Sequence, residues 1–131
     1  MGEEAVVGLR RWAPDAPVWL SAVVLEELYA GADEHARRGV ERLERDFDRT
    51  RRILVPNLSD WKQAGKVLAG LAAEYGYERI GQARLTNDAL IAMSAARQGI
   101  TVITANQRDF AMLARVRPFL WEVTSTGGSR V

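Results

Sequence analysis

The sequence contains no cysteine, one histidine and only two lysines among its 131 residues. Without cysteine the chain has no disulfide, no thiolate metal ligand and no cysteine nucleophile. The single histidine, His35, leaves no room for a site built from several imidazoles. No apolar run approaches the ~20 residues of a membrane span, and no basic segment followed by an apolar core marks a secretory signal. These absences predict a cytoplasmic protein with no membrane association, whose chemistry depends on carboxylates, hydroxyls, amides or arginine.

Arginine supplies sixteen of the eighteen basic residues, although the net charge is only +1. Seven arginines and four acidic residues lie between Arg37 and Arg52. The planar guanidinium suits phosphate recognition, so this stretch is a candidate for nucleic-acid binding. The other interpretation is a solvated helix face with ion pairs three and four residues apart, such as Glu41 with Arg45 and Arg38 with Glu41. The mixed signs of charge favour the solvated face.

Short apolar runs alternate with helical periodicity along the chain. Strands are predicted at 18–20, 53–55, 100–104 and 119–123. Helices are predicted within 1–12, between Ser21 and Gly31, around 40–47, from Trp61 to Tyr75, up to Arg97, and at 107–116. The helix at Trp61 is expected to be capped by Ser59 or Asp60, and the one ending at Arg97 by Thr86 or Asn87. This alternation predicts one α/β domain over residues 1–131 with a mostly parallel central sheet and a flexible tail at 124–131.

Three carboxylates, Glu27, Asp88 and Asp109, are expected near one edge of that sheet. Ligands of parallel sheets bind beyond the carboxyl ends of the strands, and the polar residues Thr104 and Asn106 also follow a predicted strand. Oxygen ligands of this kind suit Mg2+ or Mn2+. The alternative is structural, because an aspartate in the first turn of a helix is favoured by capping and by the helix dipole.

Two segments carry a resemblance to a known family. Residues 21–32 read SAVVLEELYAGA, and residues 87–92 and 99–110 read NDALIA and GITVITANQRDF. Their order and spacing resemble those of VapC-type PIN domains, in which a serine ends a strand before a helix with Glu-Leu and Gly-Ala. The second half of that pattern is Asp-Ala-x-Ile-Ala, a glycine, a strand ending in threonine, and Asn-x-x-Asp-Phe. The similarity covers roughly residues 17–116.

The resemblance implies a PIN-like three-layer sandwich and a metal-dependent endoribonuclease, commonly the toxin of a toxin–antitoxin pair. It places Glu27, Asp88 and Asp109 at three of the family's four acidic positions, with Thr104 and Asn106 in support. The implied cofactor is Mg2+ or Mn2+. The implied partners are an RNA substrate, a VapB-like antitoxin and a second copy in a homodimer.

The family's opening strand, which ends in Asp-Thr or Asp-Ser, has no counterpart here. Its aspartate is the fourth acid, and the early acids Glu3, Glu4 and Asp15 do not follow an apolar strand. By resemblance, the chain is expected to be shortened at its N-terminus, to lack the central strand and to have two exposed interior strand edges. The apolar run 5–9, a partner chain or a swapped second copy could fill that position. The sequence therefore leaves two functions open: a nuclease weakened by the missing acid, or a non-catalytic module that binds an antitoxin or RNA.

Overall fold

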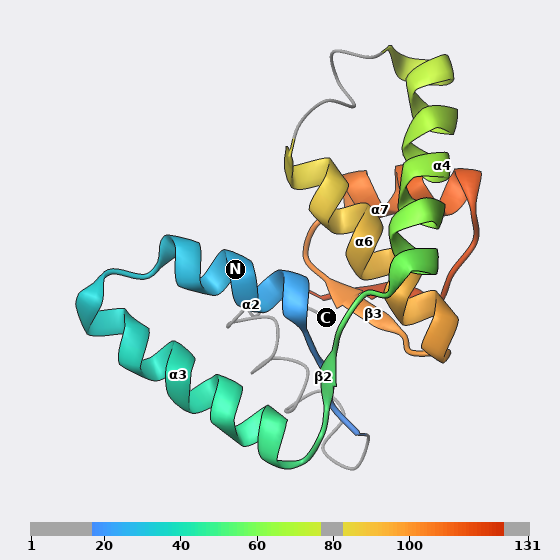
Figure 1. Cartoon of the computed structure of the whole chain (residues 1–131). Helices are drawn as coiled ribbons and strands as arrows, with labels where there is room; N and C mark the ends of the chain where they lie inside the picture. The colour runs from blue at the N-terminus through green and yellow to red at the C-terminus, as the bar shows by residue number, and fades with distance from the viewer. Residues whose placement is uncertain (1–16, 77–82, 125–131) are drawn as a thin grey trace. The chain divides into compact units, whose positions relative to one another are not determined.

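The computed structural model describes residues 17–76 and 83–124. The chain forms two compact units, Met1–Val55 and Pro56–Val131 (Figure 1). The first contains β1 (Leu20–Ser21), α2 (Ala22–Gly31), α3 (Glu34–Arg49) and β2 (Ile53–Leu54). The second contains α4 (Leu58–Tyr75), α6 (Ala83–Gln98), β3 (Val102–Thr104), α7 (Gln107–Val116) and β4 (Trp121–Val123). None of the helices in the described ranges is long and apolar enough to cross a bilayer.

The first unit is built around a short parallel strand pair. Leu20 of β1 lies opposite Ile53 of β2. Ser21 ends β1 and caps α2, because its hydroxyl accepts a hydrogen bond from the N–H two residues on. Asp33 caps α3, which packs against α2 (Figure 1). Leu20 and Phe47 form the buried centre of this unit. The side chains packed against them are Val18, Val24, Leu25, Leu43 and Ile53.

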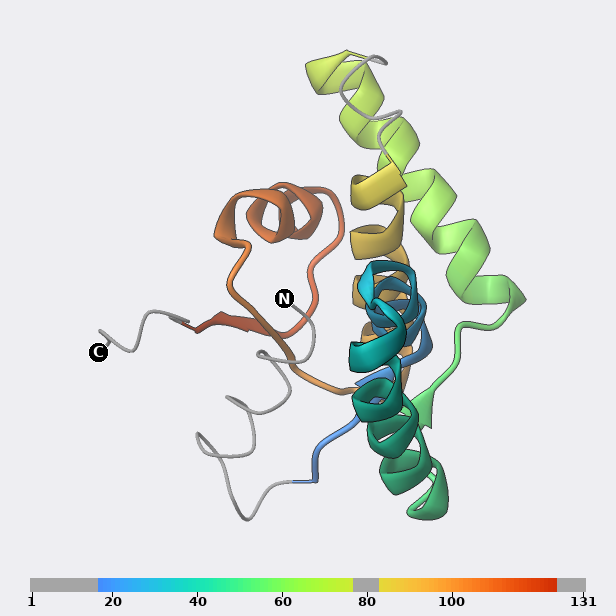
Figure 2. The same ribbon diagram turned by 90° about the vertical axis from the view of Figure 1, so that its left-hand side faces the viewer.

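The second unit packs three helices beside another parallel strand pair. Val102 of β3 lies opposite Trp121 of β4. Helices α4, α6 and α7 contact one another, and α6 also packs on β3 (Figure 2). Only three residues separate α6 from β3, with Gly99 in a left-handed conformation (φ +68°) at the turn. The first half of α6 is thereby brought to the carboxyl end of β3.

The parallel α/β character predicted from the sequence is confirmed. Each predicted strand is present with shorter bounds, and both pairs are parallel. Among the described residues, β1 pairs with β2 and β3 with β4, in two separate sheets. Several predictions lie outside the described residues. They are the helix within 1–12, the apolar run 5–9, the absent first strand and the tail beyond Thr124. The single domain over 1–131 stays a prediction.

Two predicted helix caps are wrong. Asn57 caps α4, instead of Ser59 or Asp60, and Asn57 and Asp60 exchange two hydrogen bonds of 2.9 Å in a capping box. Helix α6 begins at Ala83, so Thr86 and Asn87 lie inside it. The apolar face of α6 starts one turn earlier than predicted, since Leu85 is buried together with Ala89 and Ala92.

Trp61 does not belong to the buried stripe of α4, although its spacing predicts it there. Its exposed fraction is 55%, whereas that of the preceding residue, Asp60, is 2%. Arg97 of α6 donates from Nε to both carboxylate oxygens of Asp60 at 3.0 Å. This ion pair holds Asp60 on the side that faces α6, and Trp61, about 100° further around the helix, faces outward. The other predicted stripe members are buried or half-buried: Ala64, Val67, Leu68, Leu71, Ala72 and Tyr75.

Candidate metal centre

Four of the predicted site residues come together at the carboxyl end of β3. Thr104 is the last residue of β3, and Asn106 is the N-cap of α7. Asp109 lies in the first turn of α7. Asp88 reaches the same place from α6 and is 4% exposed. Residues 18 positions apart in sequence therefore share one site, as the rule for parallel strands predicts.

The Asn106 side chain connects the two carboxylates. Its Nδ2 donates to Oδ2 of Asp109 at 2.9 Å and to Oδ2 of Asp88 at 3.3 Å. Its Oδ1 accepts from the backbone N–H of Asp109 at 3.3 Å, which is the capping interaction. One amide group thus caps α7 and holds carboxylates from two helices within hydrogen-bond reach of a single nitrogen.

Thr104 supports Asn106 through the backbone. The hydroxyl Oγ1 of Thr104 accepts a hydrogen bond of 2.9 Å from the Asn106 N–H. Thr104 is itself buried, with an exposed fraction of 8%. The turn between β3 and α7 is therefore held by a short local contact, and the position of the Asn106 side chain follows from it.

The structural alternative for Asp88, a capping role in a first helical turn, is excluded by the geometry. Helix α6 begins at Ala83, so Asp88 is its sixth residue and lies in the second turn. Its carboxylate is buried on the same face as Leu85, Ala89 and Ala92. Asp109 does occupy a first turn, so the dipole and capping explanation holds for that residue alone. A buried carboxylate directed at a second one needs a specific role or compensation.

The donor set fits a hard divalent cation. Two carboxylates supply anionic oxygen ligands, and Mg2+ is commonly bound by one or two carboxylates with water and substrate phosphate in its remaining positions. The two acidic groups at this place are oxygen donors, which is the ligand type that Mg2+ and Mn2+ prefer.

A comparison with protein families identifies the family of the chain. The PIN domain family matches residues 2–116, which is most of the chain. The chain belongs to the PIN domain family. No curated protein gives a significant match. Among solved structures, a DNA-bound VapBC from Salmonella typhimurium has a TM-score of 0.64 at 21% sequence identity. That match covers 92% of this chain and 84% of the other, and at this identity it shows a common fold.

Glu27, the remaining acid expected from the PIN resemblance, lies in the other unit. It is a half-buried residue of α2, whereas Asp88 and Asp109 belong to the Pro56–Val131 unit. Across residues 17–76 and 83–124, no group of three or more histidine, aspartate or glutamate side chains comes within metal-binding reach. The described PIN site is therefore a pair of carboxylates, and the ligand role of Glu27 stays a prediction.

The burial of Asp88 is the feature that sequence reasoning missed. The spacing of Leu85, Asp88, Ala89 and Ala92 is that of one helical face, so a helix starting before Thr86 would have placed Asp88 among apolar residues. The predicted cap at Thr86 or Asn87 hid this pattern by starting the helix too late. Both residues are tolerated inside a helix at a small cost in free energy, and both do lie inside α6.

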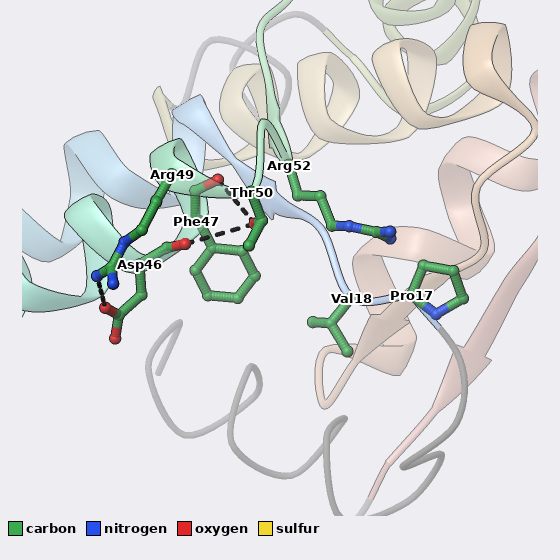
Figure 3. Close-up of a pocket in the computed structure, with 7 residues that line it drawn as sticks. All are labelled: Pro17, Val18, Asp46, Phe47, Arg49, Thr50 and Arg52. Carbon is green, nitrogen blue, oxygen red and sulfur yellow. Dashed lines mark hydrogen bonds and ion pairs between the residues drawn. The ribbon is translucent and has the colours of Figure 1, made fainter.

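A pocket of about 440 Å³ lies in the first unit (Figure 3). It is lined by Pro17, Val18, Asp46, Phe47, Arg49, Thr50 and Arg52. Figure 3 shows Arg49 directed toward Asp46, to which it donates a hydrogen bond of 2.8 Å. Since none of the predicted site residues lines this pocket, it is not the metal centre.

Proposed function

We propose that this PIN-domain protein is a Mg2+- or Mn2+-dependent endoribonuclease and the toxin component of a VapC-type toxin–antitoxin pair. The observation that carries the proposal is the bridge made by Asn106 between Asp88 and Asp109 at the carboxyl end of β3. This pair offers the oxygen ligands that phosphodiester cleavage by a bound divalent cation requires.

In this proposal Asp88 and Asp109 hold the metal, and Glu27 completes the carboxylate set. Bound metal would lower the pKa of a coordinated water and neutralise charge on the scissile phosphate. Asn106 keeps the two carboxylates in place, and Thr104 keeps Asn106 in place. No imidazole is required, which suits a chain whose single histidine is in an exposed turn of α3.

The partners follow from the same proposal. A VapB-like antitoxin would cover the acidic site, and a second copy of the chain would form a homodimer. The fold shared with a VapBC protein supports the antitoxin partner. Action on cellular RNA would place the protein in the cytoplasm.

A second candidate function is a non-catalytic PIN module that binds an antitoxin or RNA. It is favoured by one observation, namely that within the described part of the Pro56–Val131 unit the site contains two carboxylates, Asp88 and Asp109. A missing ligand weakens a metal site and lowers activity.

Cleavage of a structured RNA in the presence of Mn2+ separates the two functions. The nuclease proposal predicts cleavage by the unmodified chain and a loss of at least about 100-fold with Asp88→Asn, because a metal ligand is removed. The matched control is Asp48→Asn, which neutralises an exposed aspartate of α3 and should leave the rate unchanged. Equal rates for the unmodified chain and Asp88→Asn would rule out the nuclease function.

A further inference from the structure

Helix α3 carries four exposed arginines in a row. Arg38, Arg42, Arg45 and Arg49 are spaced by four, three and four residues, which is the spacing of one helical face. The buried residues of α3, Val40 and Phe47, lie on the opposite side. The row therefore projects away from the core of its unit, over about 16 Å at a rise of about 1.5 Å per residue.

The solvated face of α3 carries fewer ion pairs than its sequence spacing predicts. Along α3, the ion pair within the described residues is Arg49 with Asp46, whose side chains are 74% and 58% exposed. Neither Arg38 nor Arg45 has an ion pair with Glu41 there. The solvated helix face predicted for this stretch is present, but the two Glu–Arg pairs named for it, Glu41 with Arg45 and Arg38 with Glu41, are not formed.

One acidic residue of α3 forms a contact with the neighbouring helix. Glu44 accepts a hydrogen bond of 2.6 Å from the Tyr29 hydroxyl of α2. This contact holds Glu44 toward α2, on the flank of α3 and away from the arginine row. Among the described residues Arg38, Arg42 and Arg45 form no ion pair, and the pair of Arg49 with Asp46 is exposed, so that an external anion can compete for it.

We propose that the row formed by Arg38, Arg42, Arg45 and Arg49 binds the phosphate backbone of a polynucleotide. The identity of that polynucleotide as RNA rests on the proposed function. The guanidinium fork binds phosphate oxygens with two parallel hydrogen bonds, and successive turns of the helix offer one fork each. Contacts to the phosphate backbone do not distinguish one base from another. The row would therefore position the strand, and other residues would choose the cleavage site.

The test is binding of a fluorescein-labelled single-stranded RNA by the full chain in EDTA, measured by anisotropy across a range of salt concentrations. Removal of three phosphate contacts in R38Q/R42Q/R45Q is expected to reduce affinity by about tenfold or more and to lower the slope of log affinity against log salt by about 2. The charge-preserving variant R38K/R42K/R45K should keep the slope. The matched control is K62Q/K66Q/R117Q, which removes three exposed charges from the other unit and should change affinity by less than about twofold.

Three outcomes would overturn the proposal. They are an equal loss of RNA affinity in R38Q/R42Q/R45Q and K62Q/K66Q/R117Q, no loss of RNA affinity in R38Q/R42Q/R45Q, or binding of polyglutamate with the same affinity as RNA. DNA of the same sequence should bind with similar affinity, because the contact is to the backbone. Far-UV circular dichroism of each variant checks that α3 is folded. A chain that binds through the row but never cuts would contradict the nuclease function and leave this inference standing.

Discussion

Asn106 donates a side-chain hydrogen bond of 3.3 Å to Asp88 and so joins the N-cap of α7 to the second turn of α6. The same nitrogen donates to Asp109 at 2.9 Å. The contact brings two carboxylates to one place that neither helix could create alone. It also separates two roles of Asn106, capping of α7 and alignment of the carboxylates, which substitution can test independently.

Replacing Asn106 with serine should preserve the cap and remove the bridge. Serine is nearly as good an N-cap as asparagine, so the change of cap should cost less than about 0.5 kcal/mol, and any larger loss of unfolding free energy reflects the lost hydrogen bonds to Asp88 and Asp109. The affinity for Mn2+ should fall by about 10–100-fold, as for other residues that orient metal ligands. Calorimetric titration with Mn2+ measures the affinity, and urea denaturation measures stability. An unchanged Mn2+ affinity in Asn106→Ser would show that Asn106 does not align the two carboxylates.

Mn2+ should stabilise the unmodified chain against heat and should not stabilise Asp88→Asn. A metal that binds only the folded state adds about 2.7 kcal/mol at 100 times its dissociation constant. In EDTA, Asp88→Asn should be at least as stable as the unmodified chain, because one of two neighbouring charges is removed. Thermal melts with and without Mn2+ check both statements. Equal shifts in the two proteins would locate any Mn2+ site elsewhere.

The ion pair of Asp60 with Arg97 should contribute far more to stability than that of Asp46 with Arg49. Asp60→Asn is expected to reduce the unfolding free energy by about 2 kcal/mol, because a buried carboxylate loses a charge-assisted partner and part of a capping box. Asp46→Asn affects a pair on an exposed helix surface and should cost less than about 0.5 kcal/mol. Urea denaturation of both variants makes the comparison, and similar losses would contradict the assigned burial of Asp60.

Tyr29 should give α2 and α3 a stabilising contact that is lost in alkali. The hydrogen bond to Glu44 raises the pKa of the Tyr29 phenol above its ordinary value of 10.0, with burial and the Glu44 charge acting in the same direction. Because the folded-state pKa is raised, the contribution is complete below pH 10.0 and disappears as the pH rises through the higher folded value.

The check is the difference in unfolding free energy between the unmodified chain and Tyr29→Phe from pH 7 upward. The difference should be constant at neutral pH and should shrink once the pH passes 10.0. If this difference in unfolding free energy grew above pH 10.0, the pKa of Tyr29 would be lowered by folding. That result would contradict the hydrogen bond from the phenol to the carboxylate.

Local sequence was sufficient for much of the fold and for placing Thr104, Asn106 and Asp109 after one strand. The helix at 107–116 has the predicted bounds, because Asn106 is a strong cap and the apolar spacing within the helix is regular. Glycine at position 99 ends α6 as predicted, since it adopts the left-handed conformation that terminates helices. Helix starts at Leu58 and Ala83 were less predictable, because several polar residues nearby are acceptable caps.

By itself, the sequence determined the order of elements, the parallel character of the strands and the presence of Thr104, Asn106 and Asp109 after one of them. These depend on residue spacing and on turn chemistry within a few positions. Only the tertiary structure decided that Asp88 is buried against Asn106, that Asp60 and not Trp61 faces α6, and that the arginines of α3 lack their expected partners. Each of these outcomes depends on a contact with another helix, and the energy of such contacts exceeds the small local preferences that a sequence pattern expresses.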